Sequence, residues 1–313
     1  MKVIFGVDVG GTNIKLGKFN LESNDLNNCV IEKYMVKTEV DENPNVLVDQ
    51  IYNEIMSHLG DDELIGLGVG IPGPVVNGTV LGAQNIKWEV VNLEELLKNK
   101  FPNILIKILN DANAATLGEW YYGYNHKKSN AILITLGTGV GGGIILNGHL
   151  IEGATGSAGE IGHIKIFPFN GRPCSCGLVG CLEQYASATG IVKTARGLMK
   201  NKMTTLSKIK FLNAKVIFDE AKAGDEVAKE VAERTAYYLS VGLASICNTI
   251  NPDVVIIGGG VSKAGEYFLK KVRAYFEDLA FFSVKNTEIV LATLLNDAGI
   301  YGNYINVIQS LDK

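Results

Sequence analysis

The sequence predicts an α/β protein built from two domains in close contact. Its 313 residues correspond to about two domains of roughly 150 residues each. Short apolar, β-branched segments alternate with segments of helical periodicity, which is the order expected of α/β domains. One arrangement, a strand followed by a glycine turn with a Gly-Thr pair and a second strand, occurs at residues 1–19 and again at 131–146. We expect a smaller domain over 1–115, against which a helix of 298–313 packs, and a larger domain over 116–297.

The first half of the chain opens with a hairpin. Two apolar strands within residues 1–19 meet at Gly10-Gly11, and a glycine pair tolerates the backbone angles of a tight turn. Leu47, Ile51 and Ile55 recur at helical spacing, and Asn110-Asp111 stands where a strand gives way to a helix. The elements expected after the hairpin are a helix over 45–59, a strand over 66–71, a helix over 93–100, a strand over 104–109 and a helix over 112–122.

The second half begins with another hairpin and continues mostly in helices. A strand over 131–136 leads into a glycine-rich turn over 137–143 and a return strand over 144–146. Residues 235–252 carry no charge, but their serines, threonines and asparagines favour a buried helix over a membrane span. The elements expected after this hairpin are helices over most of 187–250, a strand over 253–257, a helix from about 263, a strand over 289–292 and a helix from 298.

The composition restricts the class of protein. With 47% hydrophobic and 20% charged residues, the chain is globular and not a disordered chain, a collagen or a coiled coil. The 29 basic and 33 acidic residues give a net charge of −4, which argues against nucleic acid or an anionic membrane as partner. Asp8 interrupts the first apolar segment before it could form an export signal. Three of the five cysteines are clustered, unlike a secreted disulfide framework, so we expect a cytoplasmic protein.

Two glycine turns are candidates for binding phosphate. Gly10 and Gly11 would let backbone N–H groups point into a concavity, where Thr12 adds a hydroxyl. Asp8, at the end of the preceding strand, could hold Mg²⁺ directly or through water. One such turn alone could be a simple hairpin connection, but two facing turns would grip a polyphosphate across a cleft. A third close backbone approach, suited to a flat nucleoside, follows a later buried strand. The second turn contains Thr138 and Gly139. The third approach is at Gly259 and Gly260.

A cysteine cluster predicts a metal site. Cys174, Cys176 and Cys181 follow the spacing Cys-x-Cys-x4-Cys, and His163 lies shortly before them. One histidine and three cysteines complete a closed tetrahedral zinc site. Because no ligand position stays open for water, the zinc would be structural. The alternative is a group of three reduced thiols in a cytosolic loop.

Two carboxylates flank this predicted zinc site. Glu160 lies three residues before His163, and Glu183 lies two residues after Cys181. If one ring nitrogen of His163 binds zinc, the other can face a substrate hydroxyl. Carboxylates that accept hydrogen bonds from vicinal hydroxyls suit a sugar, whereas either glutamate alone could be a solvated surface charge.

Asp111 is the catalytic candidate. It stands at the C-terminal end of a strand and opens a helix, which is where α/β proteins bind ligands, although an aspartate there can also be an N-cap. Transfer of a phosphoryl group to a hydroxyl needs a group that orients the hydroxyl and accepts its proton. Kinases commonly use one aspartate for this purpose.

These segments resemble the ROK family (repressors, open reading frames and kinases) of the actin-like ATPase superfamily. The resemblance covers about residues 2–302 and is most specific in Glu160-Ile161-Gly162-His163 and in the stretch from Cys174 to Glu183. It implies the two-domain actin-like ATPase fold (ribonuclease H-like) with an interdomain cleft. Phosphate loops at 8–12 and 136–138 and an adenosine loop at 258–260 would then bind ATP with Mg²⁺.

The resemblance also implies the roles of the sugar-binding residues. Asp111 matches the catalytic base of the family, and the family's sugar pocket matches Gly73, Asn110, Glu160, His163 and Glu183. A Gly-Ala-rich run over 153–160 is typical of the family's glucokinases, so we expect the conversion of glucose to glucose 6-phosphate, a step of glycolysis. Family members are commonly dimers or tetramers, which implies a homo-oligomer.

Other functions stay open. The acceptor could be mannose, N-acetylmannosamine or allose, and the donor could be polyphosphate. A sugar-responsive repressor of the family would carry a helix-turn-helix segment before the first phosphate loop, and only seven residues precede Asp8. A non-catalytic actin-like scaffold would leave the carboxylates beside the cysteines without a role.

Overall fold

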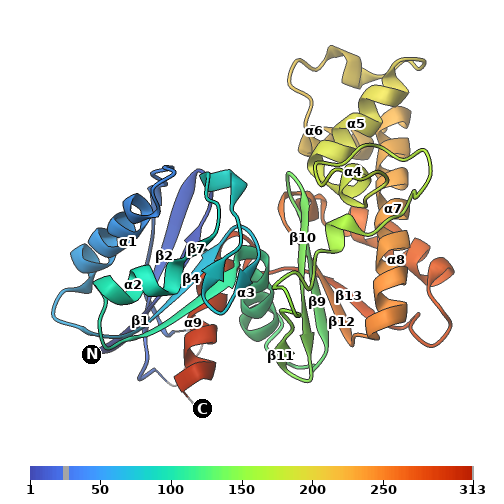
Figure 1. Ribbon diagram of the computed structural model, residues 1–313. Helices are drawn as coiled ribbons and strands as arrows, with labels where there is room; N and C mark the ends of the chain where they lie inside the picture. Colours follow the sequence, from blue (N-terminus) through green and yellow to red (C-terminus); the bar gives the residue numbers. More distant parts are fainter. Residues whose placement is uncertain (24–27, 312–313) are drawn as a thin grey trace. The chain divides into compact units, whose positions relative to one another are not determined.

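The computed structural model describes residues 1–23 and 28–311, which form two compact units (Figure 1). The first unit contains Met1–Lys127, His149–Ala158 and Leu294–Lys313, and the second contains Lys128–Gly148 and Gly159–Thr293. The predicted boundary between residues 115 and 116 falls inside a helix, and the division into these two domains stays a prediction. The C-terminal helix is α9 (Ala298–Leu311); the last two residues of the range predicted for it lie outside the described part of the chain.

The first unit is built on a five-stranded sheet. In spatial order its strands are β3 (Val30–Lys37), β2 (Asn13–Asn20), β1 (Lys2–Val9), β4 (Glu63–Ile71) and β8 (Leu105–Asn110). The predicted hairpin is confirmed, because β1 and β2 pair antiparallel, and β4 and β8 continue the sheet in parallel. The sequence analysis missed β3, whose mostly exposed side chains give it no apolar face.

Helices cover both faces of this first sheet. Apolar residues of β1 such as Phe5 pack in one core with α1 (Pro44–Leu59) and α2 (Leu93–Lys100), both of which were predicted. On the opposite face α9 lies against the backbone of the sheet, since a Cβ on Gly68 would stand 2.1 Å from the carbonyl oxygen of Asn303. Only glycine allows so close an approach of helix to strand.

The predicted helix over 112–122 divides into two parts. It is α3 (Asp111–Gly118), followed by a π-helical turn over Glu119–Gly123. Also unpredicted is a small antiparallel sheet of very short strands, which pairs few residues and therefore leaves little sequence pattern. Its strands are β5 (Val75–Val76), β6 (Thr79–Val80) and β7 (Val91–Asn92), and a 3₁₀ turn lies at Gln84–Ile86.

The second unit repeats the plan of the first sheet. Its neighbouring strands are β10 (Val140–Leu146), β9 (Ala131–Leu136), β12 (Val254–Gly258) and β13 (Glu288–Leu291). The two-residue strand β11 (His149–Leu150) falls within the residue ranges of the first unit. The pair β9 and β10 is antiparallel, whereas β12 and β13 continue in parallel.

The predicted glycine-rich turn over 137–143 is too long. Strand β10 resumes at Val140, and Gly141, Gly142 and Gly143 are paired with residues of β9. Gly142 serves close packing, because a Cβ there would lie 2.5 Å from the Cδ1 atom of Ile161. The turn itself is limited to residues 137–139.

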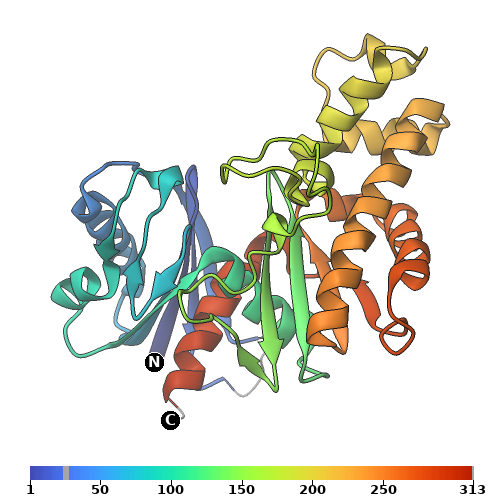
Figure 2. The same ribbon diagram turned by 45° about the vertical axis from the view of Figure 1, so that its right-hand side comes forward.

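Helices form most of the rest of the second unit, as predicted. They are α4 (Glu183–Ala186), α5 (Ala188–Met199), α6 (Ala214–Ala223), α7 (Glu226–Ile250) and α8 (Glu266–Leu279). In two views α7 and α8 lie side by side (Figures 1 and 2). The helix expected from about residue 263 begins at Glu266, after a 3₁₀ turn over Gly260–Ala264.

The apolar stretch over 235–252 lies mainly in α7. Most of its apolar side chains are buried in the core of the second unit, which confirms the interpretation as a buried helix. Within residues 1–23 and 28–311, no helix has the length and apolar character needed to cross a membrane.

Candidate functional site

The first glycine turn lies at the end of β1 and presents exposed backbone. The N–H of Gly10 donates to the carbonyl of Asn13 over 2.9 Å, which closes the turn. Thr38, just after β3, holds it from the side: its hydroxyl donates to the carbonyl of Gly10 over 2.6 Å, and its N–H donates to the carbonyl of Thr12 over 2.9 Å. Gly11 and Thr12 are exposed, so their N–H groups can meet a ligand.

Asp8 turns its carboxylate toward the start of α9 in the first unit. A Cβ on Gly299 would lie 2.6 Å from the carboxyl carbon of Asp8, so any larger residue there would displace this carboxylate. The ammonium of Lys15 donates to Asp8 over 3.2 Å and to the carbonyl of Asn296 over 2.8 Å. Burial raises the pKa of the Asp8 carboxyl, and Lys15 opposes that rise. This bond between Lys15 and Asp8 was not predicted, although the hairpin register sets the two residues directly opposite each other.

Asp111 is the first residue of α3, and the N-cap of that helix is Asn110. The side-chain oxygen of Asn110 accepts from the N–H of Ala112 over 2.9 Å and from that of Asn113 over 3.2 Å. An aspartate was expected as a possible N-cap, but Asn110 takes this role and leaves Asp111 in the first helical turn. The Asp111 carboxylate accepts from the N–H of Ala112 over 2.8 Å.

Asn110 also connects the start of α3 to the turn that contains Gly73. Its side-chain amide donates to the carbonyl of Gly73 over 3.0 Å. Gly73 has a φ of +96°, and a Cβ there would lie 2.0 Å from the carbonyl oxygen of Gly82. Glycine is therefore required at this position, and the structure brings Gly73, Asn110 and Asp111 into one cluster.

The second glycine turn is held by the corner between α4 and α5. The N–H of Ala188 donates to the carbonyl of Gly137 over 2.8 Å, and the hydroxyl of Thr189 donates to the carbonyl of Thr138 over 2.9 Å. Glu183 accepts from the N–H of Val140 over 3.1 Å, immediately after the turn. Glu183 was predicted beside the cysteines and, from the family resemblance, in the sugar pocket. Its bond to this turn was not predicted, because nothing in the chain order relates Glu183 to the turn.

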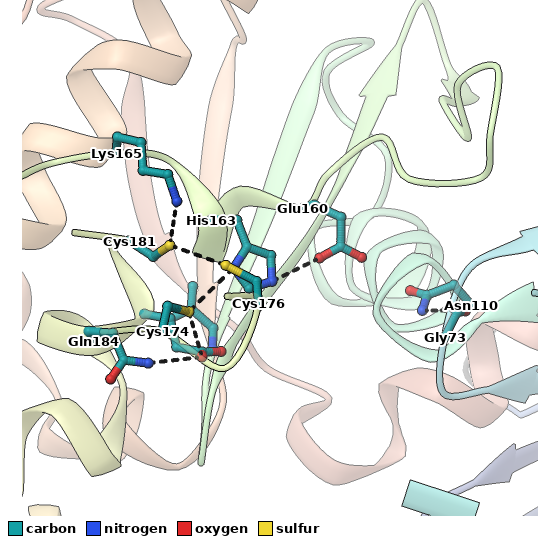
Figure 3. A network of polar contacts seen from close by, with 11 residues as sticks. Gly73, Asn110, Glu160, His163, Lys165, Cys174, Cys176, Cys181 and Gln184 are labelled. Carbon is teal, nitrogen blue, oxygen red and sulfur yellow. Dashed lines mark hydrogen bonds and ion pairs between the residues drawn. The ribbon is translucent and has the colours of Figure 1, made fainter. Parts of the chain in front are cut away.

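The four predicted metal ligands lie together in the second unit (Figure 3). The side-chain nitrogen and sulfur atoms of His163, Cys174, Cys176 and Cys181 all lie within 4.8 Å of one another. The Nδ1 atom of His163 is 3.8 Å from the sulfur of Cys174, and the sulfurs of Cys176 and Cys181 are 3.6 Å apart. A tetrahedral zinc site separates its ligand atoms by about 3.3 to 3.8 Å. This donor set therefore fits a closed tetrahedral metal site.

Charged and polar groups shift the pKa values of thiols in this cluster. The ammonium of Lys165 donates to the sulfur of Cys181 over 2.7 Å. Burial raises the pKa of the Cys181 thiol to about 11, and Lys165 counteracts part of this rise. Burial also acts on the Cys174 thiol, but hydrogen bonds from Cys176 and its neighbours outweigh it and bring the pKa to about 6. Of these two thiols, Cys174 therefore ionises more readily.

His163 directs its two ring nitrogens to different partners. Nδ1 faces the cysteine sulfurs, whereas Nε2 lies 3.8 Å from a carboxylate oxygen of Glu160 (Figure 3). The Glu160 and His163 side chains are 50% and 36% exposed, so a polar ligand can reach both. That Nδ1 binds a metal while Nε2 faces a substrate stays a prediction.

The third predicted loop borders a small cavity. Gly259 has a φ of +82°, and a Cβ there would lie 2.6 Å from the backbone of Leu136. Gly260 lines a cavity of about 110 Å³ together with Phe218 and Lys263. A neighbouring groove of about 330 Å³ begins at Thr138. The second turn and the Gly259-Gly260 loop thus lie next to concave surfaces of the second unit.

Comparisons with known proteins agree with this arrangement. The ROK family profile matches residues 4–310. A glucokinase of Halalkalibacterium halodurans is 39% identical over 310 residues, which are 95% of this chain and 92% of that protein. A xylose repressor of Caldicellulosiruptor bescii is 32% identical over 98% of this chain and 78% of the repressor. 

Solved structures give the same result. The crystal structure of a ROK family glucokinase from Streptomyces griseus, in complex with glucose and AMPPNP, aligns with a TM-score of 0.78 and 31% identity. The alignment covers 98% of this chain and 99% of that chain. The predicted α/β fold of the actin-like ATPases is confirmed, whereas the predicted cleft between the domains stays a prediction. Since both the family profile and these relatives extend over nearly the whole sequence, the chain belongs to the ROK family.

Proposed function

We propose that this ROK protein is an ATP-dependent hexose kinase whose preferred acceptor is glucose and whose product is glucose 6-phosphate. The observation that carries the proposal is the 39% identity to a glucokinase over 95% of the chain. The aligned glucokinase structure, whose ligands are glucose and AMPPNP, supports the same pair of substrates. The cluster of Gly73, Asn110 and Asp111 supplies the chemistry that this reaction needs.

Asp111 is the proposed general base. One of its carboxylate oxygens accepts from the N–H of Ala112, which fixes the orientation of the group. The carboxylate accepts the proton of the sugar 6-hydroxyl as the sugar oxygen bonds to the γ-phosphorus. The bond between the γ-phosphorus and the bridging oxygen breaks in line, and ADP leaves. A carboxylate of low basicity suffices, because bond breaking runs ahead of bond making in such transition states.

The two glycine turns are the proposed donor site. The N–H groups at Gly11 and Thr12, and those at Thr138 and Gly139, would bind the phosphate oxygens of ATP, whereas the N–H of Gly10 closes the first turn. Asp8 would hold Mg²⁺ directly or through water, and the ion would neutralise charge on the β- and γ-phosphates. The loop at Gly259-Gly260 would receive the adenosine. Polyphosphate is the alternative donor.

We propose that zinc occupies the Cys3His cluster in a structural role. Its ligands would be Nδ1 of His163 and the sulfurs of Cys174, Cys176 and Cys181. Three thiolates and a neutral imidazole leave a net charge of −1 on a Zn²⁺ site, and the ammonium of Lys165 beside Cys181 offsets it. The metal would fix Glu160, His163 and Glu183 for hydrogen bonds to sugar hydroxyls.

The cellular context is also part of the proposal. Clustered thiols suit the reducing cytoplasm, and a dimer or tetramer is the proposed assembly, without nucleic acid or membrane as partner. A sugar-binding regulator is the second candidate, favoured by the 32% identity to a xylose repressor. A regulator would bind sugar without turning it over.

The test is a coupled assay of ADP release with Mg-ATP and a panel of hexoses. Glucose-dependent release of ADP is the expected result. No turnover of any sugar, with ATP or with polyphosphate, would instead favour the sugar-binding regulator. Asp111→Asn should lower kcat by about 10²- to 10⁴-fold and leave sugar binding, measured by calorimetry, largely intact. Asp49→Asn, which removes only a surface ion pair with Lys100, is the matched control. Retained turnover in Asp111→Asn would exclude this residue as the base.

A further inference from the structure

Arg172, in the loop just before the first cysteine of the cluster, has no role in the mechanism above. Its guanidinium donates to the carbonyl of Gln184 over 2.8 Å and to that of Gly190 over 3.2 Å. It also donates to the hydroxyl of Thr194 over 3.0 Å. One side chain thus bonds the backbone of both α4 and α5.

An aromatic contact completes this attachment. The guanidinium carbon lies 4.6 Å from the centre of the Tyr185 ring, and the N–H of Arg172 donates to the Tyr185 hydroxyl over 2.7 Å. Tyr185 is itself buried against Phe167 and Tyr238. The planar fork of arginine can make several directed bonds and stack at the same time, which a lysine ammonium cannot do.

The corner between α4 and α5, which Arg172 holds, contacts the proposed binding groups of both substrates. On one side of the corner is Glu183, the proposed sugar ligand, which accepts from the N–H of Val140. On the other side are Ala188 and Thr189, which hold the carbonyls of Gly137 and Thr138 in the proposed phosphate turn. The corner is tightly packed, because a Cβ on Gly190 would lie 2.7 Å from the Gln184 backbone. A shift of the corner therefore moves the carboxylate and the turn together.

We infer that Arg172 is a positioning residue that holds the α4–α5 corner, and through it both Glu183 and the glycine turn at 137–139, in the geometry required for phosphoryl transfer. The bonds of its guanidinium go to Gln184, Gly190 and Thr194, none of which is a proposed sugar, phosphate or metal ligand. The functional part of this inference rests on the proposed kinase activity, whereas its structural part does not.

The experiment compares Arg172→Lys, Arg172→Ala and the control Arg234→Lys, which keeps the positive charge and alters a surface ion pair with Glu230. Arg172→Lys should raise the KM of both sugar and Mg-ATP by about tenfold, with a smaller fall in kcat, since charged hydrogen bonds that preorganise both ligands are lost. Zinc content should not change. Millimolar guanidinium should restore part of the lost kcat/KM in Arg172→Ala and none in the wild type.

Backbone amide exchange provides a readout that does not depend on turnover. Exchange should accelerate in the segments over 137–144 and 183–194 of both Arg172 variants, and the rest of the second unit should keep its protection. Wild-type KM values in Arg172→Lys, or a lower melting temperature with unchanged kinetics, would overturn the functional part of the inference. Unchanged exchange in these two segments would overturn the structural part. A wild-type protein that turns over no hexose would refute the proposed function, and amide exchange would then decide the role of Arg172 by itself.

Discussion

The two glycine turns follow the same strand plan but obtain their carboxylate from different sources. In the first unit the acid is local, because Asp8 stands in β1 just before Gly10. In the second unit no acidic residue precedes the turn in β9, and the carboxylate of Glu183 comes from α4 instead. That carboxylate lies where a side chain at Gly139 would begin, 2.4 Å from a Cβ built there.

The attachments of the two turns differ in the same way. Thr38, one residue beyond β3, supplies both bonds that hold the first turn from outside the hairpin. The second turn depends on α4, α5 and, through them, on the loop of the cysteine cluster. The first turn is therefore largely a property of one small sheet, whereas the second is assembled from distant segments. We expect changes at the first turn to act on the donor, and changes around the second to act on both substrates.

The largest predicted effect tests the local carboxylate. Asp8→Asn keeps the shape of the side chain but removes the charge proposed to hold Mg²⁺, so kcat should fall by about 100-fold or more and the Mg²⁺ concentration for half-maximal activity should rise. Glu183→Gln should instead act mainly on the KM of the sugar. Titrating Mg²⁺ in steady-state assays of both variants measures this contrast. Equal effects of the two substitutions on Mg²⁺ dependence would remove the distinction between the turns.

The cysteine cluster should influence the second turn only. Cys176→Ala removes an exposed proposed ligand, so the protein should lose its zinc and bind sugar about 10- to 100-fold more weakly, the range seen when metal sites lose supporting groups. Mass spectrometry of the metal and calorimetry with sugar measure both quantities. Cys247→Ala is the control: this thiol is buried away from the cluster, and its loss should lower stability without releasing zinc. A full zinc complement in Cys176→Ala would mean that the ligands are misassigned.

The contrast between the turns also shows which features of the fold and the site could be predicted from the sequence. The hairpins, the helices with clear periodicity and the parallel strands all follow from local patterns. The exposed strand β3 and the two-residue strands β5 to β7 carry almost no pattern of this kind. In the same way, Asp8 could be selected from its position beside Gly10. The bonds from Glu183 to Val140 and from Lys15 to Asp8 depend on tertiary packing and on strand register, which no local spacing reveals.

A pair of glycine substitutions tests the remote carboxylate. In Gly139→Ala the new Cβ would meet Glu183, whose flexible end must leave the N–H of Val140. The loss of this hydrogen bond should cost about 1 kcal/mol and raise the sugar KM roughly fivefold. Gly137→Ala is the matched change, because no atom of the described residues lies within 4 Å of a Cβ there. Gly137→Ala should keep the wild-type sugar KM, and a rise equal to that of Gly139→Ala would show that Glu183 is not the group displaced.

The smallest predicted effect compares the threonine attachments of the two turns. Thr38 is 6% exposed, and its hydroxyl bonds the carbonyl of Gly10. Thr38→Val keeps the shape and loses this bond, so unfolding in urea should show a loss of about 1 kcal/mol at an unchanged m-value. Thr189 is exposed, so water can replace its hydroxyl at the carbonyl of Thr138, and Thr189→Val should cost less than about 0.5 kcal/mol. The reverse order would mean that the first turn is held by the strand pairing of β1 and β2, and that Thr38 adds little to it.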